Sequence, residues 1–293
     1  MDILKSVDIT NILAIIINCI GVIFNLLLLV MLIRLKTRRK SHFALVKSLT
    51  VADMLQSSLF LADAVGDIYL YPQKPYYLKF LLVACIEALQ LYAICTVLCH
   101  LIMLAVEHFS AIMRPLYYVN WCRRRNVVLR LIIIWVLPLV EVLLAAVGML
   151  TNYLYFMALH IFIGMMYVCL LVMSIVYVLI YKEVKKQQRQ RGGLNREEKF
   201  RHKALSTTVF ILLTFFICWA PCMVCFVITE ALSVSFDVHL TLRYITLNLT
   251  CLNSICDPLI YSLRLSKVRK IWVRSFESCF TDGSMHSEVT RAI

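Results

Sequence analysis

The stretch "TTVFILLTFFICWA", Thr207 to Ala220, decides the fold class of this chain. It is almost entirely apolar and lacks the apolar–polar alternation that a membrane-barrel strand shows over about ten positions. Backbone polar groups in lipid must be satisfied internally, so only helices and closed barrels cross a bilayer. The stretch therefore predicts a transmembrane helix.

The rest of the chain repeats this apolar character. Of its 293 residues, 61% are hydrophobic and 16% are charged, whereas a soluble domain is about half apolar and about a quarter charged. A helix needs about 20 mostly apolar residues to cross a bilayer. A buried helix of a large soluble protein would explain one such run but not a series of them. Seven segments qualify: 11–35, 43–70, 78–111, 126–149, 156–181, 204–230 and 239–263.

Short polar connections separate these segments, so we expect an all-α membrane protein, a seven-transmembrane helix bundle. Lys and Arg gather on the cytoplasmic side of such proteins, and here they crowd the connections after the first, third and fifth segments and the C-terminal tail. The N-terminus is therefore predicted outside and the C-terminus inside. Anionic lipid accounts for the net charge of +13 without a nucleic-acid partner. The opposite side carries only Lys5, Lys74, Lys79 and Arg243.

Processing signals are few. Met1 to Ile12 contains acidic residues and runs directly into the first segment, which argues against a cleavable signal peptide. The sequon Asn248-Leu249-Thr250 falls inside the last segment, so we expect no glycan there. Most of the twelve cysteines lie in apolar segments, where cysteine behaves as a small hydrophobe. Cys279 follows a basic amphipathic stretch and is a candidate for palmitoylation.

Short motifs occur in six of the seven segments, one to a segment and in a fixed order. They are "GVIFN" ending in Asn25, "SLTVADML" around Asp53, "EHFSAIMRPL" from Glu107, Trp135, "FFICWAP" ending in Pro221, and "NSICDPLIY" from Asn253. With this order and spacing the chain resembles the rhodopsin-like (class A) G-protein-coupled receptors over nearly its whole length. The resemblance implies a receptor domain over residues 1–264. Residues 265–293 would then form a short cytoplasmic surface helix and tail.

The resemblance places Asp53 in a polar cluster inside the bundle. A carboxylate at the bilayer centre costs several kcal/mol unless it faces the interior and has a partner. Family members bind sodium at such a cluster, and two close carboxylates share a cation or a proton. A hydrogen-bonded structural cluster without Na+ is the alternative. The implied members are Asn25, Asp53, Asn253, Ser254 and Asp257.

Three absences narrow the branch of the family. Gln90 stands where aminergic receptors carry an aspartate, Cys251 where opsins carry the retinal lysine, and Val83 where most members carry a disulfide cysteine. The fifth segment lacks the usual proline, and the second outer loop, Met149 to Tyr155, is short. The missing disulfide cysteine, the missing proline and the short loop together resemble the melanocortin, cannabinoid and lysophospholipid branch.

Acidic residues near the outer ends indicate the ligand. Asp63 and Glu87 stand where melanocortin receptors carry acids that hold calcium and a basic peptide. The third acid of that site corresponds to Val83, and Asp67, one turn above Asp63, is a substitute. Charge complementarity favours a cationic ligand, with Ca2+ near Asp63 and Glu87 as a further expectation. The alternative is that Asp63 and Asp67 are solvated groups. The predicted ligand-binding residues are Asp63, Asp67, Glu87, Gln90 and Trp219.

The inner end of the third segment departs from the family pattern. Glu107 keeps the family's acid, but His108 replaces the arginine and Phe109 replaces the tyrosine. Arginine is a permanently charged fork of five donors, whereas histidine titrates near neutrality. A Glu107–His108 contact would be weaker when the imidazole is neutral, which predicts G-protein coupling that is weakened and pH-sensitive. The alternative is loss of coupling.

Other residues carry activation roles by the resemblance alone. Pro221 and Pro258 bend the last two helices, and Trp219 would couple the ligand to that bend. Tyr177 and Tyr261 would meet through water in the active state.

The function implied is a plasma-membrane receptor for a cationic ligand that signals through heterotrimeric G proteins. The alternatives are a non-signalling decoy or trafficking partner, a lipid-ligand receptor and a transporter. A transporter would show internal repeats; none is evident, and the midplane acids all belong to the Asp53 cluster. No metal triad or nucleophile–base spacing suggests an enzyme.

Overall fold

The computed structural model describes the backbone of residues 2–34, 40–150, 152–191, 196–232, 236–264 and 269. These residues are helical nearly throughout and include no strand. The all-α prediction is therefore confirmed. The predicted surface helix of 265–293 lies outside the described residues, apart from Arg269.

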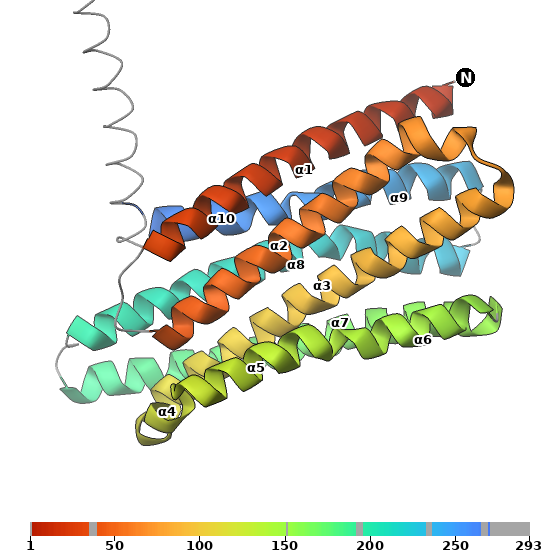
Figure 1. The fold of residues 1–293 in the computed structure, drawn as a ribbon. Coiled ribbons are helices and arrows are strands. Elements are labelled where there is room, and N and C mark those ends of the chain that lie inside the picture. Colours follow the sequence, from red (N-terminus) through yellow and green to blue (C-terminus); the bar gives the residue numbers. More distant parts are fainter. Residues whose placement is uncertain are drawn as a thin grey trace, which may run out of the picture.

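The helices form seven long rods that match the seven predicted segments (Figure 1). The fourth and seventh rods each consist of two helices end to end, and the second ends in two short turns. The elements are α1 (Asp2–Arg34), α2 (Lys40–Val65) with η1 (Gly66–Leu70) and η2 (Tyr71–Gln73), α3 (Tyr76–Met113), the short α4 (Pro115–Trp121), α5 (Arg124–Val136) with α6 (Pro138–Leu150), α7 (Asn152–Arg191), α8 (Arg196–Leu232), and α9 (Phe236–Cys251) with α10 (Asn253–Arg264).

Length and apolar composition suit these rods to a membrane. Within the described residues, five helices are long and apolar enough to cross a bilayer, and a shorter apolar helix covers Val209–Cys225. Many large apolar side chains point outward, among them Val168, which is 60% exposed, and Ile217, which is 66% exposed. Such a surface suits lipid rather than water. The chain is therefore a multi-pass membrane protein.

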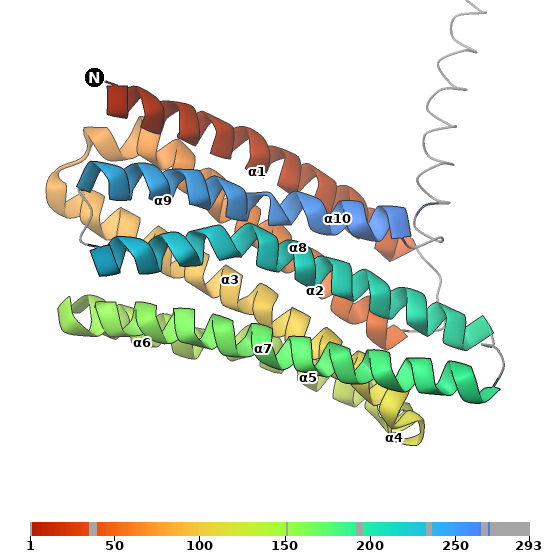
Figure 2. The ribbon, with the colours of Figure 1, turned by 180° about the vertical axis from the view of Figure 1, so that it is seen from behind.

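The rods pack into a closed bundle with α3 at its centre (Figures 1 and 2). Helix α3 contacts α2, α5, α6, α7 and α8, while α1 closes the ring by packing on α2, α9 and α10. Large apolar side chains fill the interior between them. The most deeply buried include Leu28, Leu32, Leu45, Leu49, Leu98, Leu101, Leu104 and Phe215.

Prolines and a joint shape the later rods. Pro138 starts α6, Pro221 lies inside α8 and Pro258 lies inside α10. A helical proline has no N–H, so the carbonyl four residues before it loses its usual donor. The seventh rod also breaks at Leu252, whose N–H donates three residues back, to Leu249, rather than four. Pro258 and the Leu252 joint thus interrupt the rod whose α10 half contributes Asn253, Ser254 and Asp257 to the interior.

Candidate functional site

The end of the bundle that carries the N-terminus, predicted to be the outer end, brings a carboxylate, an amide and a phenol together. The Nε2 of Gln90 donates to Asp63 at 3.0 Å, and the Tyr71 hydroxyl donates to the other oxygen of Asp63 at 3.5 Å. Asp63 comes from α2, Gln90 from α3 and Tyr71 from the turn between them. The structure therefore places two of the predicted ligand residues in direct contact.

Tyr71 organises this outer cluster. It is only 4% exposed, although residues 72–80 beside it are all exposed. Asp63, Asp67 and Glu87 each interact electrostatically with its hydroxyl, so all three acids lie near one phenol. The sequence alone does not single out Tyr71, because tyrosine near a membrane surface usually marks the interface. We call Asp63, Asp67, Tyr71, Glu87 and Gln90 the outer cluster.

Gly66 makes room for the Tyr71 ring. A Cβ on Gly66 would lie 2.5 Å from the Tyr71 Cζ and 2.7 Å from its hydroxyl oxygen. Only glycine leaves this space, so the π-helical turn η1 is tied to the position of Tyr71.

The calcium expectation receives no support from this geometry. Across the residues whose placement is described, no group of three or more His, Cys, Asp or Glu side chains is arranged to hold a metal ion.

Trp219, the fifth predicted ligand residue, is 3% exposed and stacks on Phe215 with ring centroids 5.7 Å apart.

The middle of the bundle holds the predicted polar cluster. Its five members, from α1, α2 and α10, are each at most 1% exposed. Asn25 donates from Nδ2 to the Ser254 carbonyl at 2.7 Å. That carbonyl lies four residues before Pro258 and so lacks an intrahelical donor. The asparagine of α1 therefore satisfies a backbone group that the proline of α10 leaves open.

Gly21 allows α1 to approach closely at this level. A Cβ on Gly21 would lie 2.9 Å from the Ser57 Oγ and 3.4 Å from the Ser254 Cβ. The Gly21 carbonyl also accepts a second bond from Asn25 at 3.0 Å. In the "GVIFN" motif, Gly21 therefore permits close helix packing and Asn25 forms the hydrogen bonds.

Several buried polar atoms in this middle cluster have no hydrogen-bond partner among the described residues. They are Oδ1 of Asn25, Oδ1 of Asp53, both carboxylate oxygens of Asp257, both amide atoms of Asn253 and Oγ of Ser254. Asp53 and Asp257 also lie close enough to interact electrostatically. Buried polar groups are normally paired, and hard cations prefer oxygen ligands. The residues present therefore fit a small cation.

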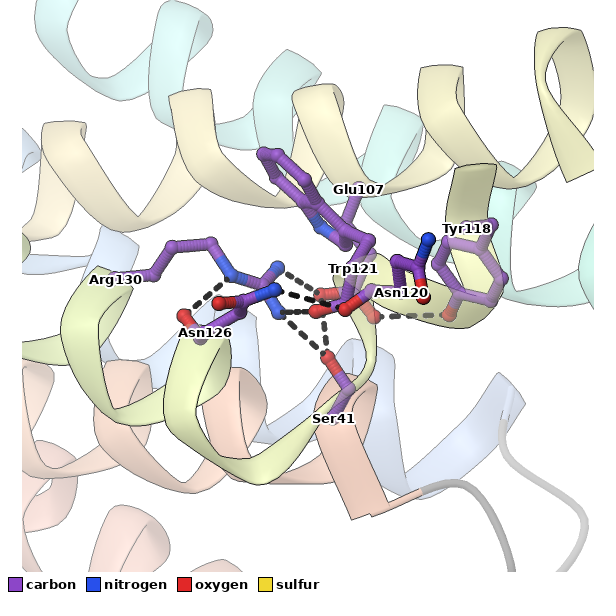
Figure 3. A network of polar contacts seen from close by, with 7 residues as sticks. All are labelled: Ser41, Glu107, Tyr118, Asn120, Trp121, Asn126 and Arg130. Atoms are coloured by element: carbon purple, nitrogen blue, oxygen red, sulfur yellow. Dashed lines mark hydrogen bonds and ion pairs between the residues drawn. The ribbon is translucent and has the colours of Figure 1, made fainter. Parts of the chain in front are cut away.

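At the opposite end of the bundle, predicted to be the inner end, Glu107 has three donors, one of which is a cation (Figure 3). The carboxylate is 1% exposed and accepts from the Ser41 hydroxyl at 3.3 Å and from the Tyr118 hydroxyl at 3.1 Å. Its third partner is Arg130 of α5, whose Nη1 lies 3.4 Å away in a buried ion pair. Burial and the Glu107 carboxylate raise the pKa of the Tyr118 phenol, so its O–H remains a donor.

Arg130 uses its remaining donors on neighbouring elements. Its Nη2 donates to Ser41 Oγ at 3.1 Å and to the Trp121 carbonyl at 2.8 Å, and its Nε donates to the Asn126 carbonyl at 3.1 Å. The guanidinium also lies 4.4 Å from the centre of the Trp121 ring. We call this group the inner network: Ser41, Glu107, Tyr118, Asn120, Trp121, Asn126 and Arg130.

His108 occupies a different environment from Glu107. Its ring is 6% exposed and lies 5.4 Å, centroid to centroid, from the ring of His42 on α2. The sequence predicts a weak contact between Glu107 and His108 as the main tie at this end. The structure instead supplies Glu107 with an arginine from α5. The sequence contains a signal for this contact, because Arg130 is a charge inside the apolar run "VVLRLIIIW". Such charges are rare and usually paired.

The remaining predicted residues are placed as follows. Phe109 packs against the core, and the buried Tyr177 and Tyr261 interact electrostatically across α7 and α10. Cys279 lies outside the described residues. Asn248 donates to the Thr10 carbonyl at 3.1 Å, so its sequon is packed against α1. The ten described cysteines are unbridged.

One further acid lies near the end of the candidate membrane span Arg124–Leu143. Glu141 lies in α6, inside the fourth predicted segment, and its Oε1 is buried. Its position three residues after Pro138 was visible in the sequence and was overlooked.

The fold and these clusters define a class of protein. The family model for the 7 transmembrane receptor (rhodopsin family) matches residues 24–261. The chain belongs to this family of receptors. It is 25% identical to cannabinoid receptor 1 of Xenopus laevis over 316 aligned residues, which cover 94% of this chain and 66% of that protein. The chain thus spans just under two-thirds of that relative, which belongs to the branch that the sequence predicts.

Proposed function

We propose that the chain is a G-protein-coupled receptor of the plasma membrane that responds to an extracellular cationic ligand, either a basic peptide or a small cation. Residues 1–264 would form the receptor, with the N-terminus outside, and residues 265–293 a cytoplasmic tail. The observation that carries this proposal is the outer cluster, in which Asp63, bonded to Tyr71 and Gln90, lies near two further acids at one end of a membrane bundle.

The outer cluster suits a cation for an electrostatic reason. Gln90 and Tyr71 are neutral donors, so they orient the Asp63 carboxylate without cancelling its charge. Asp67 and Glu87 are half-buried and add negative charge beside it. A cationic group entering here would gain charge complementarity in a partly desolvated place.

The middle cluster supports a second part of the proposal. Na+ or one shared proton would neutralise the repulsion between Asp53 and Asp257. Asn253 and Ser254 would contribute further oxygen ligands from the same helix. Pro258 and the Leu252 joint interrupt this rod. A change of charge in the middle cluster would therefore act on a helix that is already broken.

The relative favours a second candidate ligand. That protein is named a cannabinoid receptor, so a cannabinoid-type ligand is the alternative for this chain. Replacement of the arginine by His108 favours a third candidate, a receptor-like protein that does not couple to G proteins. The two ligand candidates differ in whether acids of the outer cluster matter to the response.

The test is a comparison of responses in cells that express equal surface amounts of each variant. Basic peptides, small cations and cannabinoids would be applied to wild type, Asp63→Asn and Glu87→Gln, with cAMP as the readout. Glu183→Gln on α7 is the matched control for loss of one acid outside the outer cluster. The proposal predicts that a cationic compound acts on wild type and needs at least about tenfold more compound on Asp63→Asn. A cannabinoid response that is equal in all variants would contradict the cationic ligand.

A further inference from the structure

The short helix α4 has few ways to stay attached to the bundle. It has seven residues, and most of its side chains point away: Leu116 is 89% exposed, Val119 is 70% exposed and Tyr117 is 54% exposed. It lies at the end of the bundle away from the N-terminus, beside the start of α5 (Figure 1). The attachment of α4 therefore depends on the residues that point inward.

Two residues of α4 make that attachment, and both end on the same ion pair. Tyr118 donates to Glu107 Oε1, while Trp121 offers its carbonyl and its ring to Arg130. Glu107 and Arg130 in turn hold each other and share Ser41 of α2 (Figure 3). One arginine thus connects α2, α3, α4 and α5 at the inner end.

The turn between α4 and α5 is held by the same group. Asn126 donates from Nδ2 to the Asn120 carbonyl at 2.8 Å, and its own carbonyl accepts from Arg130. Lysine could not reproduce these contacts, because it offers one point charge in place of a planar fork. The identity of residue 130 as arginine is therefore specific to this arrangement.

We infer that Arg130 is the positioning residue of the inner end, which fixes α4 and the Glu107 carboxylate in the role that position 108 does not fill. This inference rests on the proposed function for its consequence, since α4 borders the surface that would meet the G protein. His108 then lies beside the inner network and does not hold it together. Restoring arginine at 108 would add a second cation near Glu107 and would not be needed to hold α4.

Cys122 gives a direct readout of whether α4 is attached. It follows α4 immediately, is half-buried and contacts the Tyr118 side chain. The full-length protein would be treated with a membrane-impermeant maleimide in inside-out vesicles. Mass spectrometry of the peptide that carries Cys122 would then give the labelling rate, normalised to the denatured protein.

The variants separate Arg130 from nearby charges. Arg130→Met and the nearly isosteric Glu107→Gln should each raise the Cys122 labelling rate by about tenfold, because each leaves a buried partner uncompensated. Arg125→Met, an exposed arginine in the first turn of α5, is the matched control and should label like wild type. His108→Arg should also label like wild type.

Rescue distinguishes positioning by the ion pair from a general loss of packing. Arg130→Lys should label at an intermediate rate, and the exchanged pair Glu107→Arg with Arg130→Glu should label more slowly than either single charge reversal. Wild-type labelling in Arg130→Met and Glu107→Gln would overturn the inference. Faster labelling in His108→Arg, or no rescue by the exchanged pair, would overturn it as well.

This readout requires neither ligand nor G protein. If labelling follows the prediction while the receptor stays silent, the positioning role stands and the proposed function fails. If the receptor signals but the Cys122 labelling rate does not depend on Arg130, the positioning role fails and the proposed function stands.

Discussion

At the scale of single residues, the most informative contacts supply a missing hydrogen-bond donor or counter-charge to a group on another helix. Asn25 supplies the donor that Pro258 denies to the Ser254 carbonyl. Arg130 supplies the charge that Glu107 lacks on its own helix. His100 follows the same logic: Nδ1 donates to the Thr96 carbonyl, so Nε2 accepts from Ser48, whose oxygen accepts from Trp135. His100 therefore has a structural role between α2, α3 and α5.

The first prediction concerns Asn25 and Pro258 as a pair. Asn25→Ala should lower the free energy of unfolding by about 1–3 kcal/mol, because the Ser254 carbonyl then has no donor. In a Pro258→Ala background the new N–H can serve that carbonyl, so the same change should cost less. Thermal unfolding in detergent would measure both. Ser58→Ala, which removes an exposed bond to the Met54 carbonyl, is the control. Equal losses in both backgrounds would contradict this account.

At the scale of elements, breaks in the rods coincide with the sites. The turn η1 meets the outer cluster, the Leu252 joint borders the middle cluster, and α4 carries part of the inner network. Regular helix needs no side-chain partner for its backbone, whereas interrupted helix in a membrane does. The polar residues therefore gather where the helices are interrupted.

The second prediction tests η1. Gly66→Ala would place a Cβ against the end of the Tyr71 ring. The ring end can swing aside, so we expect a small loss of stability, about 1 kcal/mol, together with loss of the Tyr71–Asp63 bond. The ligand response should then shift in the same direction as in Tyr71→Phe.

Gly164→Ala is the matched control for this change, because a Cβ there would meet nothing within 4 Å. Dose–response curves for Gly66→Ala, Gly164→Ala and Tyr71→Phe would be recorded at equal surface expression. If Gly66→Ala and Gly164→Ala behave alike, Tyr71 does not need the space beside Gly66.

At the scale of the whole molecule, the middle cluster predicts that small cations stabilise the bundle. A ligand that binds only the folded state raises its stability in proportion to the logarithm of its concentration. Raising NaCl, with choline chloride holding ionic strength constant, should therefore raise the Tm of wild type. Asp53→Asn and Asp257→Asn should each abolish this rise, while Glu183→Gln should keep it. A rise that persists in both aspartate variants would locate the effect elsewhere.

The sequence predicted the architecture well because lipid imposes strong rules on it. Each rod needs an unbroken apolar segment, so its position can be read directly from the chain. The middle cluster was also predictable, since its five residues lie within ordered motifs. Arg130 and Tyr71 were not found, because their roles depend on contacts between elements. Arg130 lies 23 positions from Glu107, and no local pattern shows that α4 and α5 fold back onto α3.

The central claim is that this bundle activates G proteins although position 108 is histidine. The most direct measurement is guanine-nucleotide exchange on purified heterotrimeric G proteins of each class, using membranes with and without the wild-type chain. Arg130→Met at equal expression would serve as the comparison. We predict exchange above the empty membranes for at least one class, and a different rate for Arg130→Met. Exchange equal to empty membranes for every class, with and without the ligand library, would contradict a signalling receptor and favour the non-signalling alternative.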